Sequence, residues 1–68
     1  MYKIINNRFG NPDCVERLSD NAFIPFDPAN TDYANFKREI NESVAELQDA
    51  DGNLMTAEQA KDFVKELP

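Results

Sequence analysis

The residues around Gly52 have the types and the spacing of a calcium-binding loop. Such a loop needs oxygen ligands at alternating positions, a glycine at the sixth position and a bidentate glutamate at the twelfth. When Gly52 takes the sixth position, three acidic residues fall on matching positions: Asp49, Asp51 and Glu58. The first ligand position is then Leu47, which has no oxygen to offer, and a register that starts at Asp49 loses both the glycine and the glutamate. We therefore expect an acidic turn between two helices, with these carboxylates as a weak calcium candidate and no assigned metal site.

Cys14 is the other residue whose type suggests chemistry, because a thiolate can act as a nucleophile. The chain has no histidine that could serve as its base, and a reactive thiol needs an electropositive setting that this sequence lacks. The alternation of Cys14 with Leu18 instead predicts a small buried side chain. Only two glycines are present, so no loop is suited to cradle a phosphate. We expect no catalytic residue and no cofactor, and we predict that the protein is not an enzyme.

The length of 68 residues predicts a single small domain that spans residues 1–68. A chain of this size buries only about 60% of the surface that its unfolded form exposes, so its core is marginal. Disulfides, metals or self-association often reinforce such scaffolds. Because one cysteine cannot form an intrachain bridge, we expect support from homo-oligomerisation or from docking on a larger protein.

The net charge of −6 is unevenly distributed. Residues 1–26 contain three basic and three acidic side chains, whereas residues 27–68 contain four basic and ten acidic ones, which accounts for the whole excess. An acidic surface repels the phosphates of nucleic acids and of anionic lipids. The sequence also lacks a signal-peptide core and an apolar run of membrane-spanning length. We expect no nucleic-acid partner, no membrane partner and a cytoplasmic location.

The N-terminal part of the sequence has three short extended runs, at residues 2–6, 14–18 and 23–26. Turn residues separate them, and this alternation predicts a β-hairpin or a three-stranded antiparallel meander over about residues 1–26. Pro25 cannot donate a hydrogen bond to a ladder, so the third run is expected at an edge of the sheet.

Two helices are predicted after the strands, at about residues 31–48 and 56–67. The first is indicated by apolar residues at spacings of three and four, with an N-cap within residues 30–32: Tyr33, Phe36, Ile40, Val44 and Leu47. The second opens with Thr56 and Gln59 in a capping-box spacing. An alternative makes Asp51-Gly52 a hairpin turn between two short strands, at "VAELQ" and "NLMT". The preferred fold class is α+β, with a short antiparallel sheet packed against two helices.

Three of the seven aromatic residues are candidates for an interaction surface: Phe9, Phe23 and Phe26. Phe9 falls in a predicted turn, and Phe23 alternates with residues that are expected to face inward. The plainer interpretation is a tight core with one or two exposed rings, since isolated exposed apolar residues are normal. The functional interpretation is an apolar patch on the sheet that pairs with another subunit.

The segment "RLSDNAFIPFDPANTDYANFKREI" resembles small uncharacterised proteins of tailed bacteriophages, including phages of marine bacteria. The shared pattern, IP-x-D-x-x-N-x-DY-x-x-(F/Y), is matched by seven residues of this chain: Ile24, Pro25, Asp27, Asn30, Asp32, Tyr33 and Phe36. The closing "DADGNLMTAEQAKDFVKELP" is also similar to the tails of such proteins. Many of the relatives follow the tyrosine with a helix that contains tryptophan, and this chain has none.

The resemblance implies a small structural or assembly protein, tail-associated in some cases, that acts by protein–protein association. Its partner would be a further copy of the chain or a larger virion protein, in the cytoplasm of an infected cell or in the virion. One alternative is an acidic factor that binds and blocks a host protein. A weaker alternative is a calcium-responsive binding module. The resemblance implies no catalytic residue.

Overall fold

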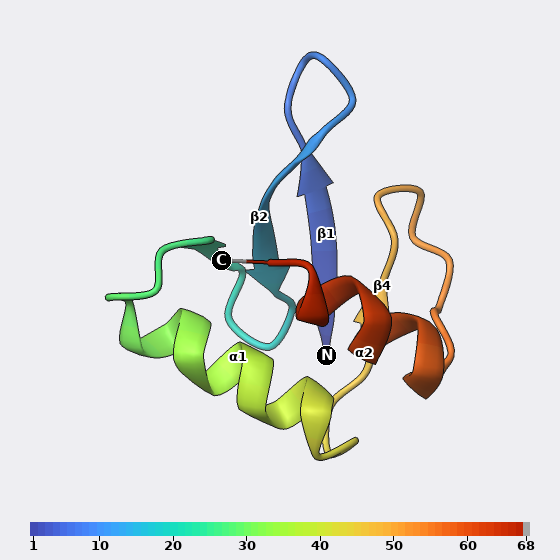
Figure 1. The fold of residues 1–68 in the computed structure, drawn as a ribbon. Coiled ribbons are helices and arrows are strands. Elements are labelled where there is room, and N and C mark those ends of the chain that lie inside the picture. The colour runs from blue at the N-terminus through green and yellow to red at the C-terminus, as the bar shows by residue number, and fades with distance from the viewer. Residues whose placement is uncertain (68) are drawn as a thin grey trace.

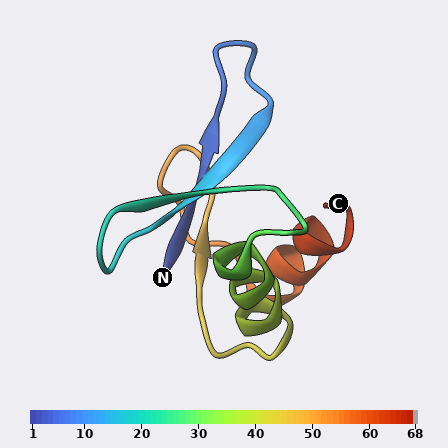
Figure 2. The ribbon, with the colours of Figure 1, turned by 90° about the vertical axis from the view of Figure 1, so that its left-hand side faces the viewer.

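The computed structural model describes residues 1–67 and has an α+β fold, as the sequence predicts (Figure 1). The elements in chain order are β1 (Tyr2–Asn6), β2 (Pro12–Arg17), β3 (Ala22–Pro25), α1 (Thr31–Asn41), β4 (Leu47–Gln48) and α2 (Ala57–Lys65). The strands form one sheet in the order β3-β2-β1-β4. Both helices lie on the same side of this sheet, and no element within residues 1–67 covers its other side (Figure 2).

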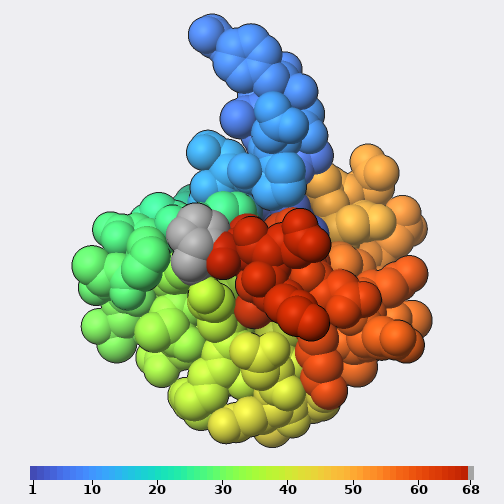
Figure 3. All heavy atoms as spheres, in the orientation of Figure 1, coloured from blue at the N-terminus to red at the C-terminus, as the bar shows by residue number. Residues whose placement is uncertain are grey.

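The predicted meander is formed by β1, β2 and β3, which pair antiparallel. The β1–β2 hairpin extends beyond the rest of the molecule, and its tip projects from an otherwise rounded body (Figure 3). Asn7 organises this tip, because its Oδ1 accepts the backbone N–H groups of Phe9 at 2.9 Å and of Asn11 at 3.2 Å. Gly10 has a φ of 81° there, which glycine adopts without the strain of a side chain.

Pro25 ends β3, and β3 is an edge strand, as the proline predicts. The turn that leads into β3 is fastened by Arg17, whose guanidinium binds both carboxylate oxygens of Asp20 at 2.9 and 2.8 Å. The same guanidinium donates to Asp32 Oδ1 at 3.3 Å. Arg17 therefore ties the β2–β3 turn to the first turn of α1.

Helix α1 begins where the polar cluster predicts. Asn30 is the N-cap, and its Oδ1 accepts the backbone N–H of Tyr33 at 3.0 Å. The helix ends at Asn41, however, and the prediction of a helix over residues 31–48 is wrong for its last part. The cause lies in the residues that directly follow.

The end of α1 is a Schellman motif. The N–H of Ser43 bonds to the carbonyl of Ile40, and the N–H of Val44 bonds to the carbonyl of Glu39, which satisfies carbonyls that the end of a helix leaves without partners. Ser43 has a φ of 58°, the left-handed conformation that glycine or asparagine usually supplies at this position. A serine gives no such signal in the sequence, so the apolar periodicity conceals the end of the helix.

The chain after α1 forms the short strand β4, which pairs parallel with β1. Gln48 then forms an antiparallel bridge with Leu54, and the N–H of Asp49 bonds to the carbonyl of Asn53 at 2.9 Å. The hairpin alternative at Asp51-Gly52 is therefore the one that the structure adopts. Helix α2 follows as predicted, with Thr56 as its N-cap and a complete capping box with Gln59.

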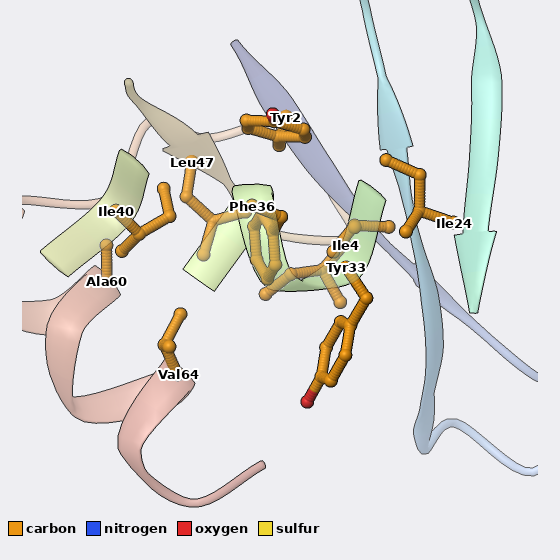
Figure 4. Close-up of a cluster of buried hydrophobic side chains, with 10 residues drawn as sticks. Tyr2, Ile4, Ile24, Tyr33, Phe36, Ile40, Leu47, Ala60 and Val64 are labelled. Atoms are coloured by element: carbon orange, nitrogen blue, oxygen red, sulfur yellow. The ribbon is translucent and has the colours of Figure 1, made fainter. Parts of the chain in front are cut away.

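The hydrophobic core lies between the inner face of the sheet and the two helices (Figure 4). Each element contributes to it at the positions that its periodicity places inward. Its ten members are Tyr2, Ile4, Val15, Ile24, Tyr33, Phe36, Ile40, Leu47, Ala60 and Val64. The rings of Tyr2 and Phe36 meet edge to face, with 4.9 Å between centroids. On β2 it is Val15, and not Cys14, that faces this core, so the expectation of a buried Cys14 is wrong.

Tyr2 makes the stability of the fold dependent on pH in the alkaline range. Its hydroxyl donates to Glu39 Oε2 at 3.1 Å, and burial together with that carboxylate raises the pKa of Tyr2 from its usual 10.0 to about 12. An unfolded chain ionises its tyrosine first, so the contribution is complete below pH 10.0 and is lost as the pH rises to about 12.

We expect the free energy of unfolding of the wild type to fall by about 2–3 kcal/mol more than that of Tyr2→Phe over this range. Urea titrations of both proteins between pH 9 and pH 12 measure the difference. The control variant retains Tyr33 and Cys14, whose pKa values are also raised, so only the Tyr2 contribution is removed. Parallel curves for the two proteins would contradict this assignment.

Candidate association surface

The acidic turn at residues 49–53 closes a hairpin. Asp49 Oδ1 accepts the N–H groups of Asp51 and Asn53, both at 2.9 Å, and Gly52 has a φ of 88°. The turn is preceded by strand β4 and not by a helix, so the helix–loop–helix frame of a calcium loop is not formed. One oxygen of Asp49 is thus already used by the backbone.

Three further features are absent from the described residues: a metal-binding cluster, a pocket and a membrane-spanning helix. Within residues 1–67, no group of three or more histidine, cysteine or acidic side chains is placed to hold a metal ion. No pocket forms on this part of the chain. None of its helices has the length and apolar character needed to cross a membrane.

The uncovered side of the sheet is the feature that remains. The alternation of side chains along a strand places every second residue on this side, which we call the open face. It consists of Lys3, Ile5, Cys14, Glu16, Phe23, Pro25, Gln48 and Leu54. Leu54 belongs to it because it is bridged to Gln48 and therefore points to the same side. Phe23 and Leu54 are 64% and 59% exposed.

Strand registers arrange the open face in two rows. The first crosses the sheet from Phe23 through Glu16, Lys3 and Gln48 to Leu54. The row therefore has two large apolar side chains at its ends and a pair of opposite charges at its centre.

The second row is entirely apolar in its side chains. It consists of Pro25, Cys14 and Ile5, which lie opposite one another on β3, β2 and β1. Cys14 is half-buried. Burial raises the pKa of the Cys14 thiol, and the carboxylates of Asp13 and Glu16 raise it further. The thiol is therefore protonated at neutral pH and contributes a small apolar surface to the open face.

The three candidate interaction residues lie in three different places. Phe23 is on the open face, and Phe9 is at the hairpin tip, where it is 72% exposed and has the Arg8 guanidinium 4.9 Å above its ring centroid. Phe26 is half-buried on the helix side, with its ring centroid 5.7 Å from that of Tyr33 and 6.3 Å from that of Phe63. The structure thus does not bring the three together.

The central charges of the open face form no ion pair within the described part of the chain. Lys3 and Glu16 lie opposite each other on β1 and β2, but neither belongs to an ion pair among residues 1–67, where the three ion pairs involve Arg17 and Arg38. Both side chains are half-buried. The open face is therefore electrically neutral overall, in contrast to the acidic part of the chain that forms the helices.

Several residues of the open face were not expected from the sequence. Leu54 and Gln48 reach it only because β4 and its hairpin extend the sheet beyond β1. The signal that could have identified them was the Asp-Gly turn flanked by "VAELQ" and "NLMT". Lys3 and Ile5 could have been found from their alternation with Tyr2 and Ile4, whose side chains are buried.

No protein-family model matches this chain, and neither a curated protein nor a solved structure is significantly similar to it.

Proposed function

We propose that the protein is a small structural or assembly protein that acts by protein–protein association through the open face. The observation that supports this proposal is an uncovered sheet face with two exposed large apolar side chains, Phe23 and Leu54, and an apolar second row. A sheet face is usually either polar or packed against another layer. Association with another protein would cover the exposed apolar side chains of the open face.

The phage-like segment agrees with such a role and extends it. The resemblance implies a structural or assembly component, and a tail-associated component would meet either further copies of itself or a larger virion protein. The proposal includes this setting, with a location in the infected cell or in the assembled particle.

We expect Phe23→Ser to abolish association of the purified protein, because the serine removes the largest exposed apolar side chain of the open face. The matched control is Phe9→Ser, which removes a similarly exposed ring at the hairpin tip and should leave association unchanged. Light scattering and sedimentation of the three proteins at equal concentrations measure the effect. If both variants behave like the wild type, or if only Phe9→Ser dissociates, the open face is not the association surface.

The charge distribution favours one second candidate, an acidic protein that binds and blocks a host protein. Exposed carboxylates on and directly after α1 include Asp32, Glu42 and Glu46, and the excess of ten acidic over four basic side chains lies entirely within residues 27–68. A complex formed through that surface would weaken strongly with added salt, whereas an apolar contact through the open face would not.

A further inference from the structure

We infer that the occupant of the open face is a second copy of this chain, and that Lys3 and Glu16 set the register of the resulting symmetric dimer. This inference rests on the proposed function and specifies its partner.

The distribution of charge selects the sheet side for contact between copies. Two molecules that each have a net charge of −6 repel each other, and residues 27–68, which include both helices, account for all of this charge. The first 26 residues have a net charge of zero. Two copies can therefore approach through the open face with their acidic helices directed away from each other (Figure 2).

The first row of one copy is complementary to the first row of a second copy that is related to it by a two-fold rotation. Consider two open faces stacked about a two-fold axis that runs parallel to the strands, between β1 and β2. Lys3 of each copy then lies over Glu16 of the other, which pairs two charges that have no ion-pair partner among residues 1–67. The same rotation places Phe23 of one copy beside Gln48 and Leu54 of the other.

The second row fits the same axis. Ile5 of one copy lies over Cys14 of the other, so that apolar side chains meet apolar side chains. An axis shifted by half the strand spacing, onto β1, would instead place Lys3 over Lys3, and like charges in contact are strongly disfavoured. The apolar residues thus supply the attraction, and the two charges select one register among those that the apolar residues alone would allow.

The size of the face predicts a weak dimer. Strands are about 4.8 Å apart and residues rise about 3.3 Å along each strand, so the four-stranded face measures roughly 15–20 Å in each direction. Such a contact falls at the small end of specific interfaces. We therefore expect dissociation in the micromolar range and an equilibrium between monomer and dimer that dilution shifts.

The test uses two charge variants and their mixture. Lys3→Glu makes the centre of the row wholly acidic, and Glu16→Lys makes it wholly basic, so each variant alone should be monomeric at low salt. An equimolar mixture should form a heterodimer, because every facing pair is then opposite in charge. The double variant Lys3→Glu/Glu16→Lys restores opposite charges both on neighbouring strands and between facing copies, and should dimerise like the wild type.

Sedimentation velocity at about 50 mM and about 1 M salt measures all five samples, with the wild type as reference. Circular dichroism confirms that each variant is folded, since like charges directly opposite on neighbouring strands cost only about 0.2–1 kcal/mol. If a single variant does not fold, the double variant still tests the pairing.

Three outcomes would overturn the inference: a mixture with no more dimer than its components, single variants that dimerise like the wild type at low salt, or a wild type that is monomeric throughout. The first two, combined with dissociation by Phe23→Ser, would leave the open face as an association surface with a different register. A monomeric wild type would reject a second copy as the occupant and would leave a larger protein as the partner of the open face. Where the wild type does associate, only insensitivity to Phe23→Ser would also reject the proposed function.

Discussion

Phe36→Ala is expected to lower the free energy of unfolding by about 3–5 kcal/mol, the range found for large aromatic side chains removed from cores. Phe36 is fully buried at the centre of the core, with its ring centroid 4.9 Å from that of Tyr2 and 6.4 Å from that of Tyr33. It therefore joins the sheet to helix α1 (Figure 4). Because small domains have stabilities near the low end of about 5–15 kcal/mol, the variant should retain only about 0–2 kcal/mol and be marginally folded at room temperature.

Urea unfolding followed by circular dichroism measures this loss. The control is Phe9→Ala, which truncates the same side chain at an exposed position and should change stability by less than about 0.5 kcal/mol. If Phe36→Ala is too unstable to titrate, Phe36→Leu gives a smaller loss that can be measured. Equal stabilities of the Phe36→Ala and Phe9→Ala proteins would contradict the described core.

Leu47→Ala is expected to cost about 2–4 kcal/mol, whereas Val44→Ala should cost less than about 0.5 kcal/mol. The two residues continue the same apolar periodicity, and a helix over residues 31–48 would bury both. In the structure Leu47 is fully buried from strand β4, and Val44 is 68% exposed after the end of α1. The pair of variants therefore distinguishes the strand from the longer helix.

Thermal and urea unfolding of the two variants and the wild type provide the comparison. Both substitutions shorten an aliphatic side chain to alanine, so differences in chemistry are small and differences in burial dominate. If both variants lost several kcal/mol of unfolding free energy, the result would favour the longer helix and would contradict β4.

The parts of the fold that follow from local chemistry could be predicted from the sequence. The turn residues and the alternation of residues 2–26 lead to the meander, Pro25 leads to the edge strand, and Thr56 with Gln59 leads to the start of α2. In each case the determining interactions lie within a few residues of one another. Such short-range signals can be read from a single sequence, because interactions elsewhere in the fold rarely override them.

The end of α1 could not be predicted, because its determinant is the conformation of one serine. Ser43 adopts a positive φ without being glycine or asparagine, and the apolar spacing continues past it to Leu47. Strand β4 depends in addition on pairing with β1, which is more than 40 residues away in the chain. Long-range pairing of a two-residue strand leaves almost no local pattern.

The candidate site was predictable only in part for the same reason. Phe23 could be placed on a sheet surface from its alternation with Ile24, but Leu54 joins that surface only through β4 and its hairpin. The central pair of charges depends on the register that places Lys3 opposite Glu16. A register is a property of two strands together, and a change of one residue would move every side chain to the other face.

The most direct test of the open face as an association surface is the solution mass of the wild-type protein over a dilution series. Size-exclusion chromatography with light scattering, from about 1 µM to about 1 mM and at low and high salt, covers the affinity expected of a small interface. We predict a mass that approaches twice the 7.8 kDa of the chain at high concentration, persists at high salt and falls to one chain on dilution. A mass of 7.8 kDa at every concentration and salt would contradict self-association through the open face.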